Sequence, residues 1–160
     1  MKSLKFRPVV AVAAVVLASM LVGACSGIRP TADQSNLVAF TTQLRGANEV
    51  PPVASAGSGQ VDAVLNKDSN LLRWKLSYAN LGSRVTAGHF HGPATVGTNA
   101  GVVLPFQGPM SSPMEGSATL TAAQVADLLA GRWYANIHTA AHPGGEIRGQ
   151  ITAIPAIPAR

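Results

Sequence analysis

Leu72-Arg73-Trp74-Lys75-Leu76-Ser77-Tyr78 is the stretch that decides the fold, because large apolar and polar side chains alternate along its whole length. Successive side chains of a β-strand point to opposite faces. The alternation therefore predicts a strand with one buried face and one face in solvent. The same period of two recurs on both sides of this stretch, so we expect a chain built mostly of strands.

Further strand patterns lie before and after this segment, and clusters of glycine and proline separate them. The predicted strands are Val38–Leu44, Val61–Leu65, Val85–His91, Val102–Phe106, Ser117–Leu120, Trp133–His138 and Glu146–Ile151. Turn sequences such as Gly92-Pro93 and Pro143-Gly144-Gly145 stand between them. Several short strands at this spacing are typical of an antiparallel sandwich or barrel.

One segment, Thr121 to Leu129, has the pattern of a helix instead. Thr121 can cap the helix, and Gln124 stands three residues later, as in a capping box. Apolar residues follow at helical spacing, and Gly131 can end the helix. We expect one short helix that packs across one end of the strands.

The N-terminus has the order of a secretory signal. Basic residues come first, an apolar run from Val9 to Val22 follows, and small residues lead to Cys25. The run is shorter than the roughly 17–25 residues of an ordinary membrane span. Val22-Gly23-Ala24-Cys25 resembles a bacterial lipobox, which implies a lipoprotein signal over residues 1–24 and a lipid on Cys25.

Cysteine usage agrees with this interpretation. Cys25 is the only cysteine, so the chain can form no intrachain disulfide, and lipidation gives the single thiol a purpose. The alternative is a plain cleaved signal with an incidental cysteine. If Cys25 is lipidated, polar residues 25–36 form a tether, and the lipid anchors the protein to a membrane of the cell envelope. We expect the outer membrane, facing the periplasm, or the cell surface.

The net charge falls when the signal is removed. The full chain has 12 Lys and Arg against 7 Asp and Glu, a net charge of +5. Without Lys2, Lys5 and Arg7 the balance is 9 against 7, or +2. The remaining basic residues are scattered singly, so we do not expect nucleic-acid binding.

The four histidines are the best clue to chemistry, because all of them fall in two short clusters. His89 and His91 form H-x-H, and His138 and His142 form H-x-x-x-H. Residues two apart in a strand share a face, about 7 Å apart. If the two strands are neighbours, three or four ring nitrogens could meet on one ion, and such ligands suit zinc or copper. The alternative is a set of half-buried, hydrogen-bonded histidines with His142 in a surface loop.

Other polar residues are candidates for support rather than catalysis. We expect Glu49, Glu146 and Arg148 to form a buried arginine–carboxylate pairing that orients loops. Asn136 shares a face with His138 and could hold its ring nitrogen. We predict no catalytic residue, because no serine stands in a G-x-S-x-G elbow and the glycines at 144 and 145 precede a strand rather than a helix.

Three motifs, in order, resemble the CHRD domain, which is named for chordin, the extracellular antagonist of bone morphogenetic proteins. They are Leu44–Pro52 (LRGANEVPP), Gly88–Pro93 (GHFHGP), and Tyr134–Thr139 (YANIHT) followed by Pro143–Gln150 (PGGEIRGQ). The resemblance runs from about Phe40 to Ile151. It implies a CHRD domain over residues 37–153, followed by a tail over residues 154–160.

This resemblance implies an all-β fold outside the cytoplasm. The expected architecture is an immunoglobulin-like, Greek-key antiparallel β-sandwich or barrel with one short helix. The family motifs include His89, His91 and His138, whereas His142 is the least secure of the four ligands. Glu49, Glu146 and Arg148 match the polar signature of the family.

A weaker likeness concerns copper-zinc superoxide dismutase, which is also a Greek-key sandwich. His89, His91, His138 and Arg148 follow one another in an order similar to that of its H-x-H, late histidine and late arginine. The chain departs from that enzyme in having no disulfide and no histidine-rich zinc loop. The likeness implies at most a convergent copper-like site.

Three functional hypotheses follow. The first is a non-enzymatic, lipid-anchored envelope protein that binds copper or zinc through His89, His91 and His138, with His142 as a further candidate. The second is a metal-free interaction or adhesion module for a protein partner that we cannot name. The third is a copper-dependent enzyme similar to superoxide dismutase.

Overall fold

The structure, a computed structural model, describes residues 36–155. The predicted signal, Cys25 and nearly all of the predicted tether lie outside the described residues, as do residues 156–160. Within the described part of the chain, no helix is both long and apolar enough to cross a membrane.

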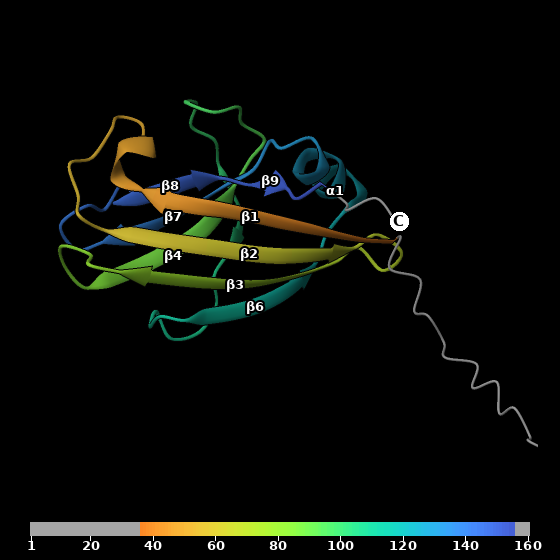
Figure 1. Cartoon of the computed structure of the whole chain (residues 1–160), viewed down its shortest axis with the longest axis horizontal. Coiled ribbons are helices and arrows are strands. Elements are labelled where there is room, and N and C mark those ends of the chain that lie inside the picture. Colours follow the sequence, from red (N-terminus) through yellow and green to blue (C-terminus); the bar gives the residue numbers. More distant parts are fainter. Residues whose placement is uncertain (1–35, 156–160) are drawn as a thin grey trace, which may run out of the picture. The chain divides into compact units, whose positions relative to one another are not determined.

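The described residues form nine strands, a short 3₁₀ turn and one α-helix (Figure 1). The strands are β1 (Leu37–Arg45), β2 (Ser58–Asn66), β3 (Leu71–Ala79), β4 (Val85–His91), β5 (Val102–Pro105), β6 (Met114–Thr119), β7 (Tyr134–Thr139), β8 (Ile147–Gln150) and β9 (Thr152–Ala153). The 3₁₀ turn η2 covers Gly46–Asn48, and the helix α1 covers Ala122–Leu129.

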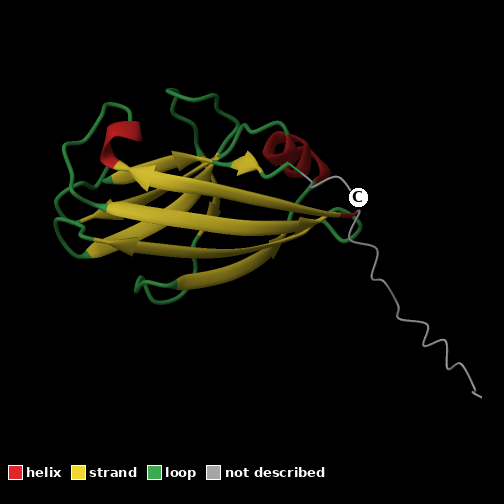
Figure 2. Ribbon diagram, in the orientation of Figure 1, coloured by secondary structure: helices red, strands yellow, loops and turns green. Residues whose placement is uncertain are grey.

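The strands make one antiparallel sheet in the order β5-β4-β7-β8-β1-β2-β3-β6, with β9 paired to β1. The sheet is strongly curled, as Figure 2 shows, and has the form of a half-barrel around its core. The predicted all-β fold with one short helix is confirmed. Because β4 pairs with β7, the H-x-H pair and His138 lie on neighbouring strands although 49 residues separate His89 from His138.

The concave side of this sheet holds the hydrophobic core. In β3, Leu72, Trp74 and Leu76 are buried while Arg73 and Lys75 between them are exposed, as their alternation predicts. The core also takes in aromatic rings, with Phe90 packed edge-on against Trp74 at 5.4 Å. Full burial of a leucine-sized side chain stabilises a fold by about 1.5–3 kcal/mol, so this face dominates the stability.

The helix α1 has the predicted capping box. The Gln124 amide donates to Thr121 Oγ1 at 3.2 Å, and the Thr121 amide donates to Gln124 Oε1 at 2.8 Å. Gly131 follows the helix with a φ of +67°, a conformation that glycine adopts without strain. Leu128 is the buried residue of this helix, which lies at one end of the sheet near β9 (Figure 1).

Strands β4, β7 and β8 carry a second, polar face on the side away from the core. Phe90, Ile137 and Ile147 point into the core, so their sequence neighbours point the other way. The polar face consists of His89, His91, Tyr134, Asn136, His138, Arg148 and Gln150. Most of it is buried because loops from residues 46–57 and 92–101 contact it, and the candidate site lies here.

Candidate metal centre

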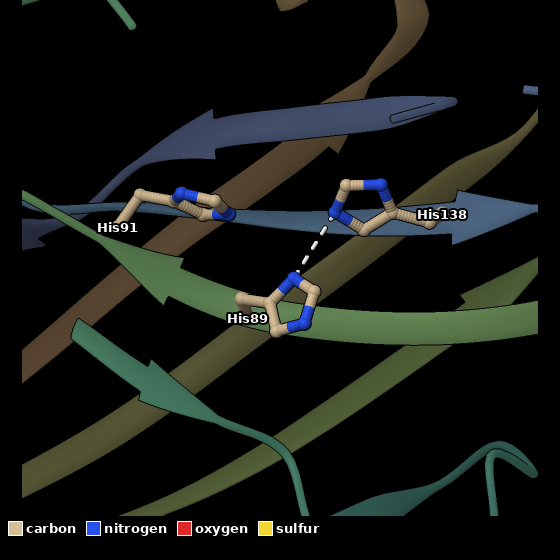
Figure 3. Close-up of side chains that lie close together, drawn as sticks. All are labelled: His89, His91 and His138. Carbon is tan, nitrogen blue, oxygen red and sulfur yellow. Dashed lines mark hydrogen bonds between the residues drawn. The ribbon is translucent and has the colours of Figure 1, made fainter. Parts of the chain in front are cut away.

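Three histidines of the polar face come together between β4 and β7. His89 and His91 project from β4, and His138 projects from β7 (Figure 3). One ring nitrogen of each lies within 4.8 Å of the other two, and His89 Nδ1 is 3.1 Å from His138 Nε2. This cluster could hold a metal ion.

Backbone carbonyls orient two of these rings. His91 Nδ1 lies 3.0 Å from the Ala100 oxygen, and His138 Nδ1 lies 2.7 Å from the Pro143 oxygen. A carbonyl oxygen only accepts, so each of these contacts is a hydrogen bond when Nδ1 carries the proton. The Nε2 atom of each neutral ring then has a free lone pair. Histidines that bind metals are usually held through the other nitrogen in this way.

Two of the rings, His89 and His91, are also held in the neutral form that metals require. Burial is the main cause that lowers the pKa of His89 to about 4, and repulsion from His138 and His91 contributes to the same shift. Burial also lowers the pKa of His91, against the effect of its hydrogen bonds to Ala100 and Asn136. At neutral pH each of these two rings therefore carries a single proton, and a metal at His89 Nδ1 requires the proton of that ring to be on Nε2.

His142 does not join the cluster. Among the described residues the group of convergent ligands holds His89, His91 and His138, so the structure brings together three of the four candidates. His142 lies in the turn between β7 and β8 and lines a cavity of about 290 Å³ with Glu49 and Gly145. The H-x-x-x-H spacing places it beyond the end of β7, where the chain has already turned.

Asn136 lies on the predicted face but contacts a different ring. Its Oδ1 is 3.0 Å from His91 Nε2, whereas the sequence pattern predicted a contact with His138. The sheet register explains the difference. Asn136 is opposite His89 in β4, so His91, two residues further along β4, is one of its diagonal neighbours. The Nδ1 of His138 is turned toward the loop that contains Pro143.

Glu49 approaches the polar face from the loop after η2. It is 6% exposed, and its Oε1 has no hydrogen-bond partner within residues 36–155. Burial raises the pKa of Glu49 to about 7, although the charge of Arg148 and the amide groups of Val50 and Asn136 act in the opposite direction. Glu49 and Arg148 together line a second cavity of about 370 Å³.

Arg148 holds a loop without forming the predicted ion pair. In the described part of the chain no carboxylate lies within salt-bridge distance of it. Its guanidinium donates to Asn99 Oδ1 at 2.8 Å and to the Thr98 oxygen at 2.5 Å, and it lies 3.4 Å from the centre of the Tyr134 ring. The Tyr134 ring in turn stacks on His91 at 4.7 Å. Arg148 thus braces the ring of a candidate ligand through Tyr134.

Glu146 also orients loops, through neutral partners. Its completely buried carboxylate accepts hydrogen bonds from Ser55 at 2.7 Å, Thr139 at 2.6 Å and the Gly82 amide at 2.8 Å. Burial alone would raise the pKa of Glu146, but these three hydrogen bonds hold it below its ordinary value. The predicted loop-orienting role therefore fits the contacts of Arg148 and Glu146, with different partners from those expected.

Sequence reasoning missed three contributors to the site: the Ala100 and Pro143 carbonyls and the Tyr134 ring. Tyr134 could have been found, because it alternates with Asn136 and His138 along one strand. The two carbonyls carry no side-chain signal, since every residue has one.

Comparison with known proteins places the chain in a family. The family model of the CHRD domain matches residues 40–151. The chain belongs to the CHRD family. The resemblance in the three sequence motifs is thereby confirmed, and the matched part of this CHRD domain contains all three clustered histidines. No curated protein and no solved structure matches the chain.

Proposed function

We propose that this CHRD-domain protein binds one transition-metal ion, copper or zinc, between His89, His91 and His138. The observation that carries the proposal is the convergence of three ring nitrogens within 4.8 Å, from two neighbouring strands. Orientation of two rings by backbone carbonyls and the lowered pKa values of His89 and His91 support it further.

The spacing of the nitrogens suits such an ion. Metal–nitrogen distances of about 2.0–2.1 Å place tetrahedral ligands about 3.3 Å apart. His89 Nδ1 and His138 Nε2 already lie 3.1 Å apart, so a small movement of the His91 ring would complete the set. Imidazole is a good ligand for both zinc and copper, so the three histidines suit either metal.

Binding without catalysis is the simpler form of this proposal. A copper enzyme acting on superoxide would benefit from an exposed cation that guides the anion toward the metal. Arg148 was the candidate, but it is 2% exposed and donates to Asn99 and Thr98. We therefore do not assign this cation a guiding function.

We also propose that a lipid on Cys25 anchors the protein to a membrane of the cell envelope, at the outer membrane facing the periplasm or at the cell surface. The lipobox-like sequence before Cys25 supports this placement. Residues 26–35 could span at most about 35 Å, from a reach of roughly 3.3–3.6 Å per residue. The CHRD domain would then work close to the membrane.

An interaction module remains the second candidate, and one surface favours it. Val64 and Ile154 are 42% and 48% exposed, and both line a shallow cavity of about 330 Å³ over β1, β2 and β3. Contiguous exposed apolar patches rimmed by polar residues are typical of contacts with other proteins, and Arg73, Lys75 and Glu115 also line this hollow. This surface is separate from the histidine cluster.

The metal content of the purified full chain tests the main proposal. Mass spectrometry after growth, and after separate exposure to copper and to zinc, is expected to find about one ion per chain. The His89→Ala and His138→Ala variants should lose it, whereas His142→Ala, the matched control outside the cluster, should keep it. A folded wild-type chain that takes up neither metal would overturn the proposal and favour the interaction module.

A further inference from the structure

His91 has one more acceptor beside it than a neutral ring can satisfy. Its Nδ1 is 3.0 Å from the Ala100 oxygen, and its Nε2 is 3.0 Å from Asn136 Oδ1. A neutral imidazole carries one proton and can donate to only one of them. When the proton is on Nδ1 and is donated to the Ala100 carbonyl, a lone pair of His91 Nε2 and a lone pair of Asn136 Oδ1 face each other. A cation placed between them would remove this repulsion.

The surroundings of Asn136 fix the direction of its amide. Asn136 Nδ2 and Glu49 Oε1 both approach Gly145, where a Cβ atom would lie 2.8 Å from Nδ2 and closer still to Oε1. Because Gly145 has no Cβ, there is space for the Asn136 amide nitrogen and the buried Glu49 carboxyl to face each other. When the Glu49 carboxyl is ionised, the reverse orientation would turn Asn136 Oδ1 toward Glu49 Oε1, an oxygen with no hydrogen-bond partner among the described residues.

The same geometry resembles part of a coordination sphere. Asn136 Oδ1 is 3.0 Å from His91 Nε2, and His89 Nδ1 is 3.1 Å from His138 Nε2. Both distances are close to the roughly 3.3 Å expected between two ligands of one tetrahedral ion with bonds of about 2.0–2.1 Å. The four atoms come from two neighbouring strands, with Asn136 and His138 two residues apart in β7.

We infer that Asn136 Oδ1 is the fourth ligand of the metal, which makes the centre a three-nitrogen, one-oxygen site for a divalent ion. The inference rests on the proposed metal binding by His89, His91 and His138. Glu49 acts as a positioning residue, because it faces the amide nitrogen and so directs the amide oxygen toward the ion.

An amide oxygen changes which metals the site prefers. Oxygen ligands favour harder ions, whereas Cu⁺ favours soft ligands and gains little from a carbonyl oxygen. A set of three imidazoles and one oxygen therefore suits Zn²⁺ or Cu²⁺ better than Cu⁺. Asn136 would be the residue that sets this preference.

Competition titrations of the full chain with Zn²⁺ and with Cu⁺ test the inference. Asn136→Leu keeps the shape of the side chain and removes its oxygen, so Zn²⁺ affinity should fall about tenfold or more, the order of effect seen when a ligand's environment is damaged. Cu⁺ affinity should change much less. Asn136→Asp supplies an oxygen at the same place and should restore Zn²⁺ binding, and the visible spectrum of bound Co²⁺ should differ between Asn136→Leu and the wild type.

The outcomes separate this inference from the proposal on which it rests. Wild-type protein that binds no metal would remove both. Wild-type protein whose Zn²⁺ affinity and Co²⁺ spectrum survive Asn136→Leu unchanged would remove the fourth ligand alone. Equal loss of Zn²⁺ and Cu⁺ affinity in both Asn136→Leu and Asn136→Asp, with thermal unfolding also lowered, would show that Asn136 only supports the fold.

Discussion

Burial at individual residues gives the candidate site its chemistry. His89 and His91 are poor bases here because charged imidazoles would lose hydration between β4 and β7. The same burial keeps their lone pairs available to a metal. Since the pKa of His89 is lowered to about 4 from its ordinary value of 6.5, protons should compete with a metal for this ring only in acid.

The lowered pKa of His89 predicts how the stability of the metal-free protein depends on pH. Between about pH 6.5 and pH 4 the unfolded chain binds a proton at this histidine and the folded chain does not. The contribution of His89 to the free energy of unfolding should therefore be highest above pH 6.5 and fall as the pH decreases toward 4. Denaturant titrations from pH 4 to 7.5, with chelator present, measure this slope, which should be shallower in His89→Ala than in His142→Ala. Equal slopes in the two variants would contradict the prediction.

The titration of Glu49 should change the free energy of unfolding with pH in the opposite direction. Burial raises its pKa to about 7, so between about pH 4.5 and 7 the folded chain holds a proton that the unfolded chain has released. Its contribution to stability is present below pH 4.5 and is lost as the pH rises through 7. In metal-free Glu49→Gln this opposing effect disappears, and stability should rise more steeply with pH than in the wild type. A slope unchanged by Glu49→Gln would mean that this carboxyl titrates normally.

At the scale of the elements, alternation and capping were enough to predict most of the secondary structure. The period of two predicted the buried and exposed sides of β3, and it placed His89 and His91 together on one face of β4. Thr121 and Gln124 predicted the first turn of α1. These signals are local, because they depend on side chains a few residues apart.

The contacts between elements could not be predicted in the same way. No local pattern shows that β4 pairs with β7 in the register that puts His138 beside His89. The contact of Asn136 with His91 instead of His138, and the loops that Arg148 and Glu146 bind, also depend on that long-range register. Strand order is a property of the whole sheet, and several orders would satisfy the same alternation.

The capping box makes a prediction about α1. Thr121→Ala removes the hydroxyl that accepts from the Gln124 amide and should lower the free energy of unfolding by about 1 kcal/mol. Thr121→Ser keeps a hydroxyl and should cost much less. Because α1 contributes no ligand, metal binding should stay at the wild-type level in both variants. Equal stability of Thr121→Ala and wild type in denaturant titrations would contradict the capping role.

The whole molecule divides its one curled sheet between two tasks. The concave face holds the apolar core, and the other face of β4, β7 and β8 holds buried polar groups under two loops. Buried polar groups are costly unless they are paired or bind an ion. A face with three histidines, a buried Arg148 and a Glu49 oxygen that is unpaired within residues 36–155 is therefore better explained by a function than by stability.

The proposed anchor belongs to this scale, because it concerns where the domain works. Cys25→Ser should abolish incorporation of labelled fatty acid and release the protein from the membrane fraction, since serine cannot form the thioether that holds the lipid. The described domain should keep its fold, as Cys25 lies outside it. Unchanged labelling and membrane association in Cys25→Ser would contradict lipidation at this residue.

X-ray absorption spectroscopy of the zinc-loaded full chain tests the central claim most directly, because it detects the imidazole rings around the ion. The account predicts three imidazole ligands in the wild type and in His142→Ala, and fewer imidazoles or no retained zinc in His89→Ala. The account would be contradicted if the wild type binds zinc through at most one imidazole, or does not bind zinc.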